Sequence, residues 1–173
     1  MVYGSFERSA PDLLQMILFL DFDGVCHPEG ARVEDRFAKL PMLECWLREQ
    51  SQVDVVISSS WRVYAELPDL ARHFAEDLRR RIVGATPVYG QLEPPPDAQW
   101  LACKREFEAV SWMNSNASPD RGWICLDDMP QIFSVGCKHL VLCDSAVGLT
   151  RRELRDIEIK LALPASLASR DPP

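Results

Sequence analysis

A strand that has to be buried, yet ends in two acids, constrains this chain more than any other feature. Residues 16–24 read MILFLDFDG, an apolar run that leads into Asp21, Phe22, Asp23 and Gly24. A continuous apolar run closed by a turn residue is typical of a buried strand in a parallel sheet. Because an unpartnered buried carboxylate is costly, we expect both acids at the carboxyl edge of the sheet, where open α/β sheets bind ligands.

The rest of the chain alternates short apolar runs with helical patterns, which predicts βαβ units. Further strands are expected at about 53–57, 122–126 and 138–143, and helices within 36–50, 61–80, 103–114 and 151–162. A short apolar piece at 82–84 is left unassigned, and Thr150 with Glu153 forms a capping-box pattern before the last helix. The pattern predicts an α/β fold, a Rossmann-like three-layer sandwich with a central parallel sheet and right-handed crossovers.

Size and composition indicate one globular domain over residues 1–173, with its core at about 16–162 and a tail at 163–173. The net charge of −7 argues against a broad nucleic-acid-binding surface, although it leaves room for a local basic groove. No apolar run approaches the roughly 20 residues of a membrane span, and the N-terminus lacks a signal-peptide pattern. We therefore expect a soluble, cytoplasmic protein that is not bound to a membrane.

The six cysteines form no C-x-x-C pair, and we expect them to be reduced and buried. Cys26 next to His27, and Cys137 near His139, are the only candidate zinc ligands. Neither pair has the two-to-four-residue loop that is usual in structural zinc sites, so zinc is disfavoured.

Polar groups follow three of the expected strands, at ends that a parallel sheet brings to one edge. They are Asp21 with Asp23, Ser58 with Ser59 and Ser60, and Asp127 with Asp128, while Lys104 and Arg105 open the third helix. Clustered carboxylates without histidine or cysteine ligands suit Mg²⁺ better than Zn²⁺. Carboxylates, a magnesium ion, a hydroxyl and a cation together form a phosphate site in which a carboxylate can act as nucleophile.

The order of these motifs resembles that of the haloacid dehalogenase (HAD) superfamily, over about residues 16–145. Each of its four motifs has a counterpart in the expected order: Asp-x-Asp-Gly-Val at 21–25, Ser58, Lys104 or Arg105, and Asp127-Asp128. The resemblance implies a HAD-like fold. Lys104 and Arg105 are both candidates for the cation of the third motif. The resemblance favours Arg105, because it stands seven residues before Trp112, the spacing found in similar members of the superfamily.

The resemblance also implies a role for each acid. Asp21 would attack phosphorus and form an aspartyl-phosphate. Asp23 would protonate the leaving oxygen and then activate water, so its presence favours a phosphatase or phosphotransferase over a dehalogenase. Asp21, the backbone carbonyl of Asp23, and Asp127 or Asp128 would hold Mg²⁺.

Four positions are candidate contacts to the substrate: Gly24, Ser58, Ser59 and Arg62. The resemblance implies that Ser58 donates a hydrogen bond to the phosphoryl group. Arg62, with its neighbour Trp61, suggests contact with a phosphate and a base. A core tryptophan followed by a surface arginine is the simpler interpretation of this pair.

The gaps at 24–57 and 59–103 leave no room for a large cap domain, so we expect a minimal cap or none, and an open site. The stretches LFLDFDGVCHP, VVISSSWR and LDD resemble a small bacterial HAD group that includes domains attached to proposed RNA-repair proteins. This resemblance implies a Mg²⁺-dependent phosphatase whose substrate is a nucleic-acid end. Two alternatives stay open: a catalytically idle module that holds a phosphorylated or protein partner, and a regulatory or toxin–antitoxin partner.

Overall fold

The fold is organised around a five-stranded parallel sheet in the order β3-β2-β1-β4-β5. It is seen in a computed structural model that describes residues 15–93, 102–117 and 121–162. The strands are β1 (Met16–Leu20), β2 (Val53–Ile57), β3 (Ile82–Ala85), β4 (Gly122–Asp127) and β5 (Leu140–Leu142). The predicted parallel sheet is thereby confirmed.

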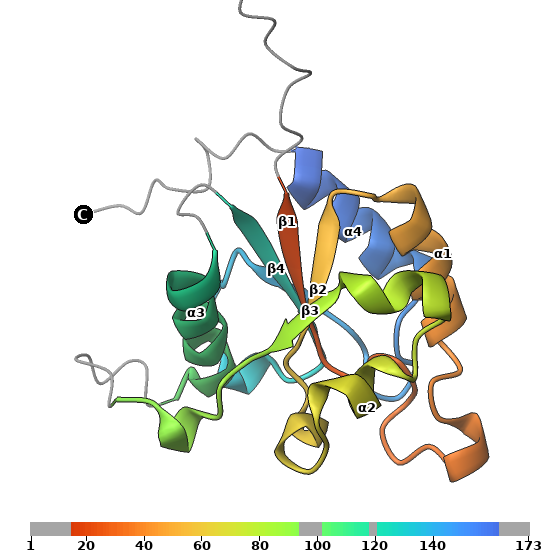
Figure 1. Cartoon of the computed structure of the whole chain (residues 1–173), viewed down its shortest axis with the longest axis horizontal. Helices are drawn as coiled ribbons and strands as arrows, with labels where there is room; N and C mark the ends of the chain where they lie inside the picture. Colours follow the sequence, from red (N-terminus) through yellow and green to blue (C-terminus); the bar gives the residue numbers. More distant parts are fainter. Residues whose placement is uncertain (1–14, 94–101, 118–120, 163–173) are drawn as a thin grey trace, which may run out of the picture.

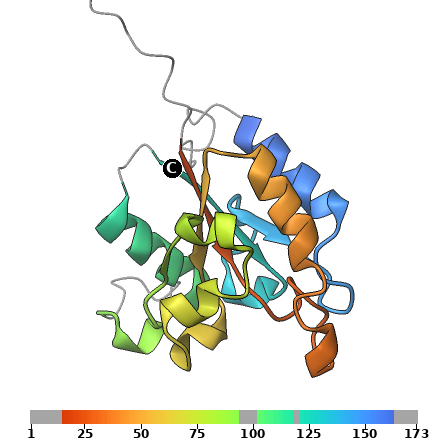
Figure 2. The ribbon, with the colours of Figure 1, turned by 45° about the vertical axis from the view of Figure 1, so that its right-hand side comes forward.

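Helices cover both faces of the sheet, which makes it the middle of three layers. They are α1 (Leu40–Glu49), α2 (Leu67–Ala71), α3 (Lys104–Asn116) and α4 (Arg151–Ala162). Short 3-10 helices lie at Val33–Asp35, Ser60–Val63, Glu76–Arg81, Tyr89–Gln91 and Pro130–Ile132. In two views α1 and α4 lie together on one side of the sheet and α3 lies on the other (Figure 1, Figure 2). The predicted Rossmann-like sandwich is therefore confirmed.

The apolar run of β1 is buried on both sides, because successive strand residues face opposite layers. Leu18 and Leu20 belong to the core that α1 and α4 share with the sheet. Ile17 and Phe19 belong to the core under α3, where the Phe19 ring meets the Trp112 ring edge-on at 5.8 Å between centroids. A strand with apolar residues at every position thus needs helices on both faces, as observed here.

The structure differs from the sequence-based expectations between β2 and α3. The unassigned piece at 82–84 forms β3, the edge strand beside β2. The helix expected within 61–80 is reduced to the five residues of α2, followed by a 3-10 turn. Pro68 lies in the first turn of α2, as its sequence position suggested, and the helix ends at Ala71.

The helices in the two motif gaps pack on the sheet or its neighbouring strand, whereas the short 3-10 helix Val33–Asp35 buries no residue. The first gap holds Val33–Asp35 and α1, and the second holds α2, β3 and three 3-10 turns. Among the described residues, no separately folded cap stands between the motifs, although 94–101 lie outside them. The predicted tail at 163–173 also lies outside the described residues. No helix in the described part of the chain is long and apolar enough to cross a membrane.

The capping box of α4 is present as the sequence predicted. The backbone N–H of Thr150 donates to a carboxylate oxygen of Glu153 at 2.8 Å, and the N–H of Arg152 donates to Thr150 Oγ1 at 3.1 Å. Two N–H groups at the start of the helix are satisfied in this way. Leu154 and Ile157 of α4 pack into the main core, so the capping box stabilises a helix that covers one face of the sheet.

We expect Thr150→Ala to lower the free energy of unfolding by about 1 kcal/mol, since it removes the acceptor for the Arg152 N–H. Thr150→Ser keeps the hydroxyl and should stay close to wild type. Urea unfolding followed by circular dichroism would measure both variants. Equal destabilisation by alanine and serine would show that the hydroxyl does not support the helix.

Candidate active site

Strand register places the motif residues side by side at one edge of the sheet. Leu20, the last residue of β1, pairs with Ile57 of β2 and with Leu126 of β4. The ladder continues for one more step, because Asp21 N–H donates to the Leu126 carbonyl at 3.1 Å and Ser58 N–H donates to the Leu20 carbonyl at 2.9 Å. Ser58, Asp21 and the residue after Leu126 therefore form a row across three adjacent strands.

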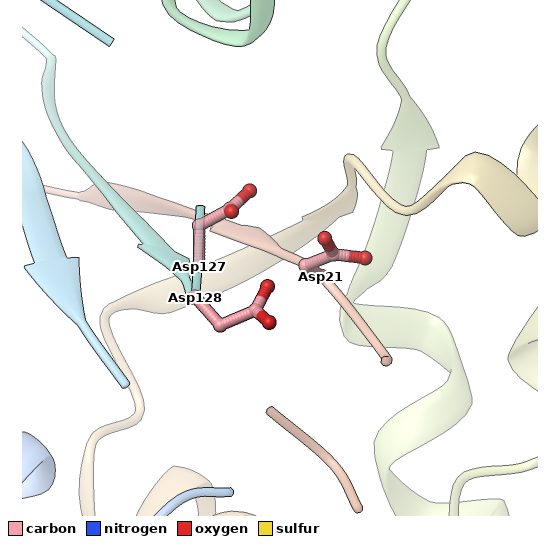
Figure 3. Close-up of side chains that lie close together, drawn as sticks. All are labelled: Asp21, Asp127 and Asp128. Atoms are coloured by element: carbon pink, nitrogen blue, oxygen red, sulfur yellow. The ribbon is translucent and has the colours of Figure 1, made fainter. Parts of the chain in front are cut away.

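Three carboxylates gather at this row. Asp21, Asp127 and Asp128 each offer an oxygen, and these three oxygens lie within 4.8 Å of one another (Figure 3). The side chains of Asp21 and Asp127 are only 6% and 1% exposed, and Asp128 is half-buried. Burial, followed by the charge of Asp21, raises the pKa of Asp127 to about 7, and the same causes raise the pKa of Asp128.

Arg105 supplies the cation of the site. Its guanidinium lies 3.6 Å from Asp21 Oδ2 and 3.7 Å from Asp127 Oδ2. Lys104 is exposed on the other side of the helix start, with its ammonium 5.7 Å from the centre of the Tyr89 ring. Of the two predicted cations, Arg105 alone contacts the acids among the described residues.

The carboxylate group fits a divalent cation. Three buried or half-buried acids face one guanidinium, which leaves an excess of negative charge. Asp127 Oδ2 is buried without a hydrogen-bond partner in the described part of the protein, while Asp127 Oδ1 accepts from Met129 N–H at 2.9 Å. An all-oxygen set of this kind suits Mg²⁺ rather than a softer metal.

Asp23, the second acid of the first motif, lies outside this group. Its side chain is 48% exposed, and its oxygens meet nitrogens instead of the other acids. His27 Nε2 is 3.0 Å from Asp23 Oδ1, and the indole N–H of Trp61 donates to Asp23 Oδ2 at 2.8 Å. The carboxylate of Asp23 is thus held beside the acid cluster with one side open to solvent.

Arg62, which the sequence suggested as a substrate contact, is instead bonded to other parts of the protein. Each of its five N–H groups has a partner: the carbonyls of Ser58, Ser59, Thr86 and Pro87, and the carboxylate of Glu108. A guanidinium has five N–H donors, so none is left for a substrate. Its side chain is buried, and it ties the loop after β2 to the loop after β3.

Glu108 was missed by the sequence reasoning. Its Oε2 lies 2.5 Å from Arg62 Nη2 and 4.0 Å from Arg105 Nε, and its Oε1 accepts from Tyr89 N–H at 2.8 Å. The buried face of α3 therefore carries charged residues, whereas the sequence pattern of such a face is normally apolar. The only sequence signal for a role of Glu108 was its position three residues after Arg105, which places both side chains on the same face of α3.

Gly24 directly follows Asp23 in the loop after β1, where its backbone meets the Asp128 side chain. Its φ of +68° is a conformation that side-chain-bearing residues rarely adopt. A Cβ built on it would stand 2.0 Å from Asp128 Oδ2. Gly24, predicted from the sequence as a substrate contact, has to be glycine here because the Asp128 carboxylate packs directly against its backbone.

Three partnerless atoms belong to three different motifs. They are Ser58 Oγ, Arg105 Nη1 and Asp127 Oδ2, each buried and without a hydrogen bond among the described residues. The same is true of four atoms outside the motifs: Arg81 Nε, Thr86 Oγ1, Tyr89 O–H and Arg121 Nε. Native proteins rarely leave buried polar atoms unsatisfied, so a hydroxyl and a guanidinium N–H beside a free carboxylate oxygen point to a ligand. Ser59, in contrast, uses its hydroxyl to accept from Trp61 N–H.

The cysteines and histidines form no metal cluster within the described residues. All six cysteines are free, and four are buried, whereas Cys45 is exposed against expectation. His27 is engaged with Asp23, and His139 Nδ1 lies 2.9 Å from the Trp123 carbonyl oxygen. Nothing in this part of the structure favours the zinc alternative.

Comparison with known proteins agrees with the resemblance seen in the motifs. A family model described as the HAD domain in Swiss Army Knife RNA repair proteins matches residues 17–154. No curated protein and no solved structure matches the chain. The matched range includes all of the sheet except Met16, together with every acid of the site, and it supports a HAD-type phosphohydrolase in general.

The pKa of Asp127 predicts how stability changes with pH in metal-free protein. Between the ordinary carboxyl range and about pH 7, folded Asp127 keeps a proton that the unfolded chain releases, so stability falls as pH rises. Asp127→Asn removes this effect. The variant should gain roughly 2–3 kcal/mol relative to wild type between pH 5 and pH 8. Urea unfolding in EDTA measures the gain, and the exposed Asp69→Asn should show no such trend. A pH-independent difference between Asp127→Asn and wild type would contradict the assignment.

Proposed function

The chain belongs to the family of HAD domains found in Swiss Army Knife RNA repair proteins, and we propose that it is a Mg²⁺-dependent phosphatase that works through an aspartyl-phosphate on Asp21. One observation carries this proposal. Around Asp21 stand two partnerless donors, Ser58 Oγ and Arg105 Nη1, and one partnerless acceptor, Asp127 Oδ2. Two donors suit phosphoryl oxygens, and a free carboxylate oxygen beside other acids suits a cation.

In the first half-reaction a carboxylate oxygen of Asp21 attacks phosphorus, and the bond from phosphorus to the leaving oxygen breaks. Asp23 gives its proton to that oxygen, so the product alcohol leaves neutral. Arg105 and Ser58 donate to the phosphoryl oxygens during the transfer. Arg105 also holds Asp21 in place, since its guanidinium lies within 3.6 Å of the nucleophile.

In the second half-reaction a water molecule attacks phosphorus of the aspartyl-phosphate. Asp23, now a carboxylate, takes the proton of that water, and the bond between phosphorus and Asp21 breaks. Inorganic phosphate leaves, Asp21 returns to a carboxylate and Asp23 is protonated again. The two steps together consume one phosphate ester and one water, and they explain why two acids follow β1.

Asp21, Asp127 and Asp128 are the side chains that would hold Mg²⁺. When bound, the ion supplies positive charge that offsets the phosphate and the acids. Without a cation these three carboxylates repel a phosphate dianion, and Arg105 alone cannot balance them. The carbonyl of Asp23 would complete the protein's share of the ligands.

A nucleic-acid end is the substrate class that we propose. Asp23, which faces the leaving group in this mechanism, is 48% exposed, whereas Asp21 is 6% exposed. The phosphate would thus be enclosed while the rest of the substrate extends into solvent. Among the described residues, the longer helices and the strands of the two motif gaps belong to the sheet and its covering layers and form no separate cap, and the family description links this domain to RNA repair.

The idle-module alternative fits the acids less well. A module that only holds a phosphorylated partner needs donors such as Ser58 and Arg105. It has no use for the Asp21 carboxylate beside the phosphate, which would repel it, or for the Asp23 carboxylate at its mouth. We therefore favour catalysis over simple binding.

Magnesium binding can be tested without any substrate. At about 10 to 100 times its Kd, Mg²⁺ should stabilise wild-type protein by about 1.4–2.7 kcal/mol. Asp128→Asn should lose this stabilisation, because it removes one ligand of the group. Asp69→Asn, an exposed acid of α2, should keep it. Thermal unfolding with and without MgCl₂ measures the effect, and unchanged stabilisation of Asp128→Asn would exclude this site.

Activity depends on the nucleophile. With Mg²⁺, wild type should hydrolyse p-nitrophenyl phosphate and phosphorylated oligonucleotide ends, and EDTA should stop both reactions. Asp21→Asn should lower kcat by at least about a thousandfold, because an amide oxygen cannot form the intermediate. Small sugar phosphates provide the comparison for substrate class. Equal rates for wild type and Asp21→Asn on every substrate would refute the proposed mechanism.

A further inference from the structure

Two side chains from separate loops converge on the Asp23 carboxylate. His27 follows β1 in the same loop as Asp23, whereas Trp61 belongs to the turn after β2. Each nitrogen meets a different oxygen, His27 Nε2 at 3.0 Å from Oδ1 and Trp61 Nε1 at 2.8 Å from Oδ2. A carboxylate that is bonded at both oxygens cannot rotate freely, although half of its surface faces solvent.

The hydrogen-bond partners of His27 determine its tautomer. The backbone N–H of Phe37 donates to His27 Nδ1 at 3.3 Å, and a backbone N–H can only donate. Nδ1 is therefore the acceptor of the ring, and the hydrogen lies on Nε2. His27 thus donates to Asp23, and the imidazole is 98% buried while doing so.

Backbone strain at Phe37 accompanies this arrangement. Its φ of +62° makes it the one non-glycine residue with positive φ in the described part of the chain. The ring of Phe37 packs against both His27 and Trp61, at 5.3 Å between centroids in each case. Strained conformations persist where surrounding contacts demand them, and they concentrate at functional sites. The strained residue here is the one that orients His27.

Trp61 is held by rings as well as by its hydrogen bond. Phe22 and Phe37 meet its indole edge-on at 5.7 and 5.3 Å, and the Arg36 guanidinium lies 5.4 Å from its ring centre. Phe22, the residue between the two acids, is fully buried in this cluster. The indole N–H is thereby aimed at a fixed point, which is the second oxygen of Asp23.

We propose that His27 and Trp61 are positioning residues that hold the Asp23 carboxyl group toward the leaving-group oxygen. This inference rests on the proposed phosphatase function, in which Asp23 is the acid and base. Each carboxylate oxygen accepts two hydrogen bonds, so one acceptor position remains on each for the exchanged proton. His27 and Trp61 act through Asp23 and do not themselves exchange protons with the substrate.

The kinetic test compares substrates that need different amounts of acid assistance. p-Nitrophenolate leaves readily without a proton, whereas the alkoxide of an oligonucleotide end requires one. Because Asp23 also activates water in the second half-reaction, which both substrates share, the comparison uses kcat/KM, which reports only the steps up to release of the alcohol. His27→Leu and Trp61→Phe should each lower kcat/KM on a phosphorylated oligonucleotide by about 10- to 100-fold, part of the value of general acid catalysis. On p-nitrophenyl phosphate the loss of kcat/KM should stay below about threefold.

Conservative and control variants separate positioning from packing. His27→Gln keeps an N–H donor near the Nε2 position and should recover most of the activity that leucine loses. His73→Leu alters the same aromatic cluster, since the His73 ring stacks on Phe37 at 4.1 Å, but His73 makes no hydrogen bond to Asp23 among the described contacts. His73→Leu should change the rates on the two substrates by the same factor. Equal losses of kcat/KM on both substrates for His27→Leu would overturn the positioning role.

A second measurement does not depend on activity. Long-range ¹H–¹⁵N NMR of the His27 ring should show the hydrogen on Nε2, and in Trp61→Phe this signal should remain. Hydrogen on Nδ1 would overturn the proposal even if the enzyme is active. Wild type that hydrolyses no phosphate ester, yet shows the Nε2 tautomer, would refute the phosphatase function and leave the His27–Asp23 contact standing.

Discussion

The parallel register of β1 with its two neighbours is the constraint on which the site depends. Backbone hydrogen bonds pair Leu20 with both Ile57 and Leu126, so the next residue of each strand emerges at the same level. Asp21 and Ser58 are held by one further ladder bond each. A slip of one residue would turn the acid of β1 into the opposite layer, because strand side chains alternate. Helices on both faces prevent that slip, since each apolar side chain of β1 is buried in one of two cores.

Charge organises what the register assembles. Arg105 stands in the first turn of α3, where the helix dipole disfavours a cation, and the buried acids compensate for that placement. Behind it, Glu108 binds Arg62, which in turn fastens the carbonyls of the Ser58 loop. The loop that presents Ser58 and the helix that presents Arg105 are therefore one connected polar unit. Negative charge remains in excess at Asp127 and Asp128, and burial, followed by the charge of Asp21, raises the pKa of both groups.

The loops after β1 and β2 meet at Asp23, and this meeting divides the site into two environments. Asp21 lies in the buried half with the acid cluster, whereas Asp23 lies at the open edge with aromatic neighbours and N–H donors. Two carboxyl groups separated by one residue can thus take different tasks. Phe22, the residue between them, is fully buried and anchors the chain where it passes from one environment to the other.

Sequence alone determined the features that depend on short-range pattern: four of the five strands, their alternation with helices that implied a parallel sheet, the capping box at Thr150 and the acids that follow β1 and β4. It also favoured Arg105 over Lys104. Only the tertiary structure decided what Arg62, Glu108 and Trp61 do, since their partners lie on other elements. Arg62 and Glu108 are 46 positions apart in the sequence, and Asp23 and Trp61 are 38 positions apart. No periodicity reports such contacts, because they exist only once the sheet has set which loops lie side by side.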